Sequence, residues 1–124
     1  MSNVSMEKIM KRYQISDSFF VNTGEKWTKI KYDEIKWVRA FENGTVIFLT
    51  DERTIMSEHK LSVIAKMLST HTNFVYINRS EIVNVDHIDG FKDNRYYIGK
   101  NELYVTSNYK TYLKEYFNDI TIHD

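Results

Sequence analysis

The stretch FVYINRSEIVNVDHIDGF, residues 74–91, contains two apolar runs separated by a polar tripeptide at residues 78–80. Each run has the length and the β-branched or aromatic content of a strand. The pattern therefore predicts a strand over 74–77, a polar kink, and a second strand over 82–85 that continues toward residue 91. Packed strand positions seldom hold an arginine without a partner, so the kink is expected to expose Arg79.

Apolar and polar residues alternate in several other segments, and this alternation predicts a β-rich body. Asn43-Gly44 lies between two such segments and is expected to form the turn of a hairpin, with Gly24 forming the turn of another. The further strands are expected at residues 19–22, 27–32, 35–41, 45–50, 53–56, 96–99 and 103–106.

Helical spacing of apolar residues appears in three places. Residues 58–69 are expected to form one helix with Ser57 as its N-cap, and residues 107–118 a second helix capped by Ser107. A third, short helix is expected over residues 6–13. The predicted fold class is mainly β, an α+β arrangement of antiparallel sheets with short flanking helices.

The chain has 124 residues, which suits one domain. We expect this domain over residues 19–118, between an N-terminal extension of residues 1–18 and a tail of residues 119–124. Cysteine is absent, which removes disulfides and thiolate metal ligands. Neither a signal peptide nor an apolar run of membrane-spanning length is present, so a soluble cytoplasmic protein without membrane insertion is expected.

Formal net charge is zero, from 17 Lys plus Arg and 17 Asp plus Glu. Neutrality argues mildly against a nucleic-acid partner, because phosphate binding needs a local excess of cations. A neutral chain can still supply that excess if its charges are segregated on the surface. Composition therefore does not decide the function by itself.

The stretch 74–91 resembles the segment of LytTR-type DNA-binding domains in which an aromatic-led strand, a His-Arg-Ser-like turn and an Ile-Val-Asn strand follow one another. Residues 31–38 (KYDEIKWV) are similar to that family's acidic turn and strand, and residues 43–48 (NGTVIF) to its next hairpin. Residues 103–110 (LYVTSNYK) are similar to its final strand and the start of a helix. The resemblance covers residues 20–117.

Two residues depart from the family's pattern: Asn78 stands where histidine is usual, and Asn108 where arginine is often found. Both keep hydrogen-bonding groups, so the departures bear on sequence preference more than on activity. An arginine fork can bond guanine O6 and N7, and an asparagine can bond adenine N6 and N7. The start of the last helix, with Lys110, suits a phosphate oxygen.

The resemblance implies a bacterial transcriptional regulator that binds double-stranded DNA sequence-specifically and reads the major groove with loops. The sequence has no H-E-x-x-H spacing, nucleophile elbow or glycine-rich phosphate loop, so no enzymatic activity and no cofactor or metal is expected. Two copies, a homodimer on DNA, are expected to bind promoter repeats. About 19 residues precede the match, so control by a receiver domain is not expected, and abundance, a regulatory protein partner or a small molecule would control activity. The implied DNA-binding residues are Asn43, Thr45, Asn78, Arg79, Asn108 and Lys110.

Rival interpretations stay open at this point. An interaction module on the same scaffold would modulate a related regulator through a strand edge without binding DNA, and burial of Arg79 in an ion pair would favour it. A platform of strand aromatics for single-stranded nucleic acid is a weaker alternative, because core packing accounts for most of them. A metal or acid/base site at Asp86, His87 and Asp89 is weaker still, because alternate strand positions point to opposite faces.

Overall fold

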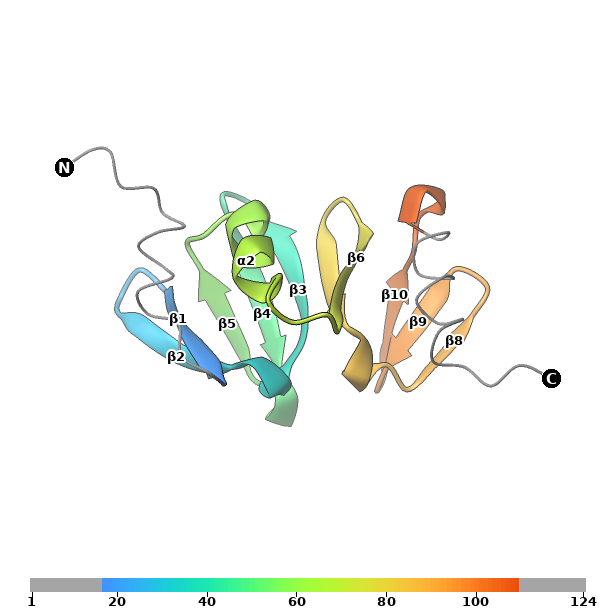
Figure 1. The fold of residues 1–124 in the computed structure, drawn as a ribbon, viewed down its shortest axis with the longest axis horizontal. Coiled ribbons are helices and arrows are strands. Elements are labelled where there is room, and N and C mark those ends of the chain that lie inside the picture. Colours follow the sequence, from blue (N-terminus) through green and yellow to red (C-terminus); the bar gives the residue numbers. More distant parts are fainter. Residues whose placement is uncertain (1–16, 110–124) are drawn as a thin grey trace.

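The structure, a computed structural model, describes residues 17–109, and its centre is a five-stranded antiparallel sheet in the order β5-β4-β3-β7-β6 (Figure 1). The strands of this central sheet are β3 (Ile35–Phe41), β4 (Gly44–Leu49), β5 (Thr54–Ser57), β6 (Phe74–Asn78) and β7 (Glu81–Asn84). A hairpin forms a second sheet from β1 (Ser18–Asn22) and β2 (Trp27–Lys31). The third sheet has the order β10-β9-β8 and consists of β8 (Gly90–Lys92), β9 (Arg95–Ile98) and β10 (Asn101–Tyr104). The expected β-rich fold is confirmed.

Helix α2 (Leu61–Leu68) and three short 3-10 turns connect these strands: η1 (Tyr32–Glu34), η2 (Thr50–Glu52) and η3 (Val85–His87). Residues 107–109 are helical, which agrees with the expected start of the last helix. The remainder of that helix and the expected helix over 6–13 lie outside the described residues. Within residues 17–109, no helix is long and apolar enough to cross a membrane.

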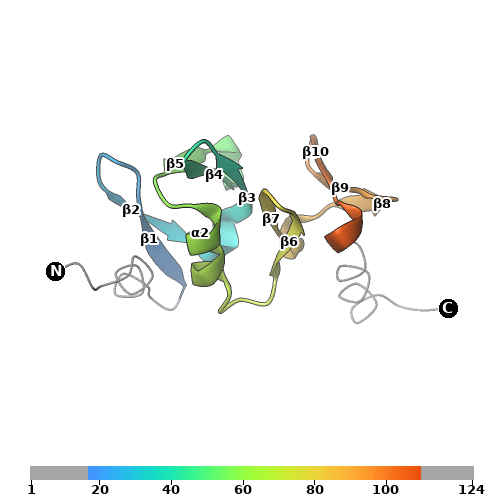
Figure 2. The same cartoon turned by 90° about the horizontal axis from the view of Figure 1, so that it is seen from above.

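The central sheet separates two apolar cores, because its strands bury side chains on both faces. Helix α2 and the β1–β2 hairpin cover one face, and the three-stranded sheet packs on the other (Figures 1 and 2). The first core includes Phe19, Ile35, Ile47 and Ile64, and the second includes Trp37, Val83, Tyr96 and Leu103.

Helix α2 confirms the helical periodicity, but it begins later than predicted and without the predicted cap. Its N-cap is Lys60, and no side chain caps it. Ser57 is instead the last residue of β5, where its buried hydroxyl lies 2.8 Å from the hydroxyl of Thr45 on the neighbouring strand. Ser57 therefore pairs within the sheet, although the local sequence suggested that it would cap the helix.

The predicted continuation of the strand from residue 85 to residue 91 is wrong, because β7 ends at Asn84 and η3 follows. The buried side-chain oxygen of Asn84 accepts a hydrogen bond from the backbone N–H of Asp86 at 3.0 Å. Its amide nitrogen donates to the carbonyl of Ile35 at 2.9 Å. These bonds turn the chain at the end of the central sheet, as Asn side chains commonly do.

The β3–β4 hairpin is confirmed, but its two turn residues are Glu42 and Asn43, since Phe41 pairs with Gly44. Glu42 takes the positive φ angle of 53°. A Cβ atom on Gly44 would lie 2.1 Å from the carbonyl oxygen of Ser57, far inside the van der Waals contact distance of a carbon and an oxygen. Gly44 is thus required by the close approach of β5, which sequence inspection of the turn does not reveal.

His59 is buried and fastens the β1–β2 hairpin to the segment that follows β5. Its Nε2 accepts a hydrogen bond from the backbone N–H of Asn22 at 2.9 Å, so this nitrogen carries no proton. The carbonyl of Asn22 accepts from the backbone N–H of Glu58, also at 2.9 Å. The ring of His59 lies 5.6 Å from that of Trp27.

Acid is therefore expected to weaken the fold. Burial outweighs the neighbouring Glu58 carboxylate and lowers the pKa of His59 below its usual 6.5. As pH falls through that value, the unfolded chain binds a proton that the folded chain does not, so the free energy of unfolding falls until the lowered folded pKa is passed. His59→Gln keeps an acceptor that does not titrate. Urea unfolding from about pH 7.5 to about pH 5 should give a flatter curve for this variant, and parallel curves would contradict the assignment.

Candidate nucleic-acid interface

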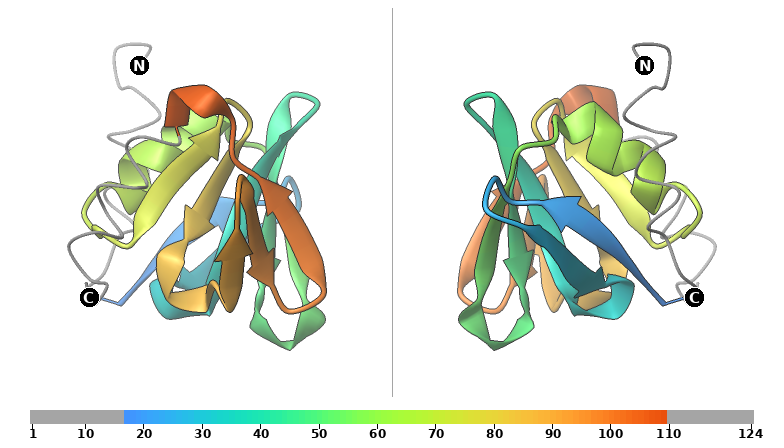
Figure 3. Two further views of the ribbon diagram at one scale, coloured as in Figure 1. Left: turned by 90° about the vertical axis from the view of Figure 1, so that its right-hand side faces the viewer. Right: turned by 90° about the vertical axis from the view of Figure 1, so that its left-hand side faces the viewer.

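Three connections lie at one end of the molecule: residues 42–43 between β3 and β4, residues 79–80 between β6 and β7, and residues 107–109 after β10 (Figures 1 and 3). We call these three segments the three-loop edge. They gather there because β3, β6 and β10 all run toward this end. A backbone hydrogen bond of 2.8 Å from Ala40 to Ser80 joins the first two segments at their bases.

Arg79 is exposed at the tip of the kink, as the sequence predicts. Among residues 17–109 it has no hydrogen-bond or ion-pair partner. Its guanidinium can therefore bond an incoming group without first breaking an internal contact. The burial in an ion pair that would favour a pure interaction module is not found.

Asn78 is placed differently from the expectation that it reads a base. Its side-chain oxygen accepts from the backbone N–H of Ser80 at 2.8 Å. Its amide nitrogen donates to Glu81 Oε1 and to the carbonyl of Tyr104, each at 3.0 Å. With both ends of the amide engaged, Asn78 braces the kink and ties it to β10. The partner on β10 is distant in sequence, so local inspection of the kink could not find it.

The other sequence-predicted residues divide between the surface and the interior. Asn43 and Asn108 are exposed within the three-loop edge. Thr45 is 1% exposed, and its hydroxyl pairs with that of Ser57, so it lies beneath the hairpin turn. Lys110 lies outside the described residues. The structure thus brings Asn43, Arg79 and Asn108 to one end of the molecule, and places Thr45 in a supporting position.

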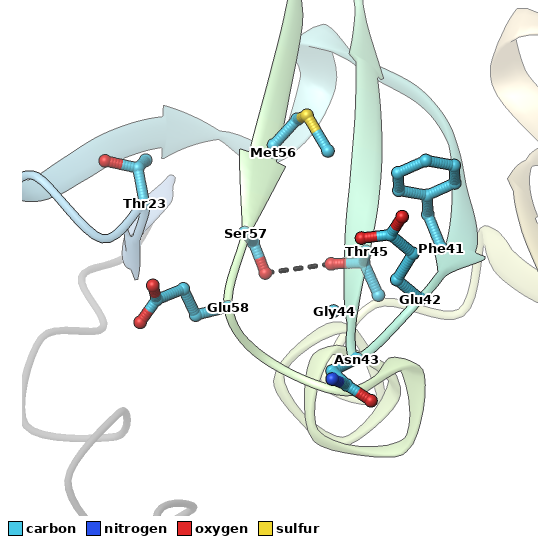
Figure 4. A pocket seen from close by; sticks show the side chains of 9 residues that line it. All are labelled: Thr23, Phe41, Glu42, Asn43, Gly44, Thr45, Met56, Ser57 and Glu58. Atoms are coloured by element: carbon cyan, nitrogen blue, oxygen red, sulfur yellow. Dashed lines mark hydrogen bonds between the residues drawn. The ribbon is translucent and has the colours of Figure 1, made fainter.

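A shallow cavity of about 450 Å³ adjoins the hairpin turn of the three-loop edge (Figure 4). Phe41 and Met56 are unusually exposed beside it, at 45% and 55%. Two carboxylates, from Glu42 and Glu58, also line it, so this part of the edge is acidic. The remaining lining residues are Thr23, Asn43, Gly44, Thr45 and Ser57.

Neither the acid/base nor the stacking interpretation gains support from the geometry. His87 belongs to η3 rather than to a strand, and its Nε2 lies 2.7 Å from the carbonyl oxygen of Asp33. Over residues 17–109, no group of three His, Asp or Glu side chains is placed to hold a metal ion. Trp37 and Phe48 stack at 4.1 Å, with Trp37 buried in the second core. These rings serve packing.

Comparison with known proteins agrees with this geometry. The model of the LytTr DNA-binding domain family matches residues 25–118, so the chain belongs to this family of DNA-binding domains. Among solved structures it is similar to the LytTr DNA-binding domain of a methyl-accepting/DNA response regulator from Bacillus cereus. The TM-score is 0.67 at 18% sequence identity, over 83% of this chain and 98% of that one, which shows a shared fold. No curated protein matches the chain.

Proposed function

We propose that this chain is a sequence-specific transcriptional regulator that acts in the cytoplasm and reads the major groove of promoter DNA with its three-loop edge. The observation that carries the proposal is the exposed Arg79 at the tip of a braced kink, with no partner among residues 17–109. Arginine pairs with guanine through two parallel hydrogen bonds, and such a pair needs a guanidinium that is both free and held in place.

The remaining residues of the edge take supporting roles in this proposal. Asn43 contacts DNA beside Arg79, and its exposure on the hairpin turn supports this role. Asn108, in the helical segment 107–109, binds phosphate together with Lys110, the second residue after it in the sequence, because backbone N–H groups at a helix start favour an anion. Thr45 and Asn78 act indirectly, because their side chains hold the two turns in place.

Two copies bound to repeated half-sites would double the number of base contacts, and we propose this arrangement for the promoter. When the two copies form a homodimer, the second binding event becomes intramolecular, which raises overall affinity. Titration of a single half-site and of a paired half-site should give a steeper isotherm for the paired DNA.

The proposal is tested by selecting bound fragments from a random duplex pool with the purified chain. We expect enrichment of one short motif that contains guanine, and affinity for that motif at least about 1,000-fold above scrambled DNA. The Arg79→Ala variant, carried through the same selection, should enrich a motif that has lost its guanine preference. Absence of any enriched motif with the unmutated chain would overturn the proposal and favour an interaction module.

A further inference from the structure

Arg39 lies beside the kink, although no sequence motif points to it. It belongs to β3 and pairs in register with Glu81 at the start of β7. The next residue, Ala40, donates its backbone N–H to the carbonyl of Ser80 within the kink at 2.8 Å. The two arginines, Arg39 and Arg79, therefore stand on adjacent segments at the same end of the central sheet.

Two contacts hold the guanidinium of Arg39. Its Nε donates to Glu81 Oε2 at 3.2 Å, and its central carbon lies 5.3 Å from the ring centroid of Phe48. The side chain is nevertheless 48% exposed. Within residues 17–109, its two terminal nitrogens have no hydrogen-bond partner. The guanidinium is therefore held through its Nε, while the edge formed by its two terminal nitrogens is available to bind another group.

We propose that Arg39 is a second DNA-contacting cation, which bonds a phosphate oxygen next to the bases that Arg79 reads. The inference rests on the proposed function of the three-loop edge. A guanidinium that is already oriented loses less side-chain entropy on binding than a free lysine or arginine does. Its open edge presents the parallel N–H groups that suit a phosphate.

The single carboxylate of Glu81 bonds both Arg39 on β3 and Asn78 in the kink, and so fixes their relative positions. Its Oε2 accepts from Arg39, while its Oε1 accepts from Asn78, the residue that braces the kink. The Glu81 side chain is 13% exposed, so the carboxylate is largely shielded from solvent. The local balance of Arg39, Arg79 and Glu81 is one net positive charge. The kink and the adjoining part of β3 thus carry a net positive charge, whereas Glu42 and Glu58 make the hairpin side of the edge acidic.

Arg53 provides a matched control for the loss of charge. It is also an arginine bonded to one glutamate, Glu34, at 2.7 Å, and its side chain is 51% exposed. It follows η2, which connects β4 to β5 at the opposite end of the central sheet (Figure 1). Removing either arginine changes net charge equally, and only Arg39 adjoins the three-loop edge.

The test is a salt titration of binding to the preferred duplex and to a scrambled one. Arg39→Ala should weaken binding to both duplexes by a similar factor and lower the slope of log K against log salt by about 0.9. Arg39→Lys should retain the slope, and Arg53→Ala should match the unmutated chain on both duplexes. The thermal unfolding temperature should fall only modestly in all three variants, because both arginines are about half exposed and Glu81 keeps its hydrogen bond from Asn78 when Arg39 is replaced.

The contrary outcomes are separable. A loss for Arg39→Ala confined to the preferred duplex, with an unchanged salt slope, would show that Arg39 acts only through Glu81 on the kink, and would overturn the inference. Unaltered binding by Arg39→Ala would overturn it as well. In both cases the unmutated chain still binds its preferred site, so the proposed function survives. Failure of the unmutated chain to bind any preferred site removes the proposed function and the inference with it.

Discussion

Arg79→Ala is expected to cost about 1 to 3 kcal/mol of binding free energy at the preferred DNA site and much less on scrambled duplex. The reason is geometric: a fork that bonds two acceptors of one base loses both bonds at once, whereas a scrambled duplex offers no matched pair of acceptors. The exposed Arg79 side chain has no hydrogen-bond or ion-pair partner among residues 17–109, so the substitution should leave the fold intact. Fluorescence titrations on both duplexes measure the difference.

Arg79→Lys serves as the companion variant, because it keeps the charge and removes the fork. It should recover binding to scrambled DNA while the preferred site stays weakened. Arg53→Ala, at the far end of the sheet, controls for net charge. Equal losses on both duplexes for Arg79→Ala would make this arginine a backbone contact, and base reading would then have to come from another residue of the edge.

Asn84→Ala is expected to have the largest effect on stability, about 2 to 4 kcal/mol, because it removes three hydrogen bonds, one of them to the buried carbonyl of Ile35. Asn84 is 1% exposed and bonds the carbonyl of Ile35 and the N–H of Asp86. It also accepts from Asn73 Nδ2 at 2.9 Å, so one side chain joins three segments. Urea unfolding at neutral pH measures the loss.

Asn101→Ala is the control for this stability prediction. Asn101 is an exposed residue whose amide donates to the carbonyl of Ile98 at 3.3 Å, so its replacement should change the free energy of unfolding by less than about 0.5 kcal/mol. A similar small change for Asn84→Ala would contradict the structural account of η3. In that case another contact would have to end β7.

The strands and the exposed kink could be predicted from the sequence, because both depend on short-range patterns of residue types. Alternation of apolar residues predicts the strands because each strand buries one or both faces regardless of which strand it meets. Exposure of Arg79 follows from its own chemistry and from the short polar kink around it. These features need no knowledge of long-range partners.

Features set by distant partners could not be predicted. The β3–β4 turn falls on Glu42 and Asn43, and glycine is needed at position 44 because the carbonyl of Ser57 approaches it from another strand. The bond from the Asn78 amide to the carbonyl of Tyr104, which is remote in sequence, is of this kind. The role inferred for Arg39 likewise depends on cross-strand pairing. These are tertiary contacts between residues distant in sequence, and residue types alone do not determine which polar groups will form them.

The two separate cores have a consequence for how DNA is chosen. The hairpin turn belongs to the central sheet, whereas residues 107–109 follow a strand of the sheet that closes the second core. Hydrogen bonds of 3.1 Å from Thr106 to Ile77 and 3.0 Å from Asn78 to Tyr104 join these parts, without a continuous ladder. If the three-loop edge binds DNA as proposed, side-chain volume inside the second core would set the spacing between its loops. A change at Leu103, which lies in that core, would then shift the preferred number of base pairs between contacted positions, and binding-site choice would evolve through residues that never touch DNA.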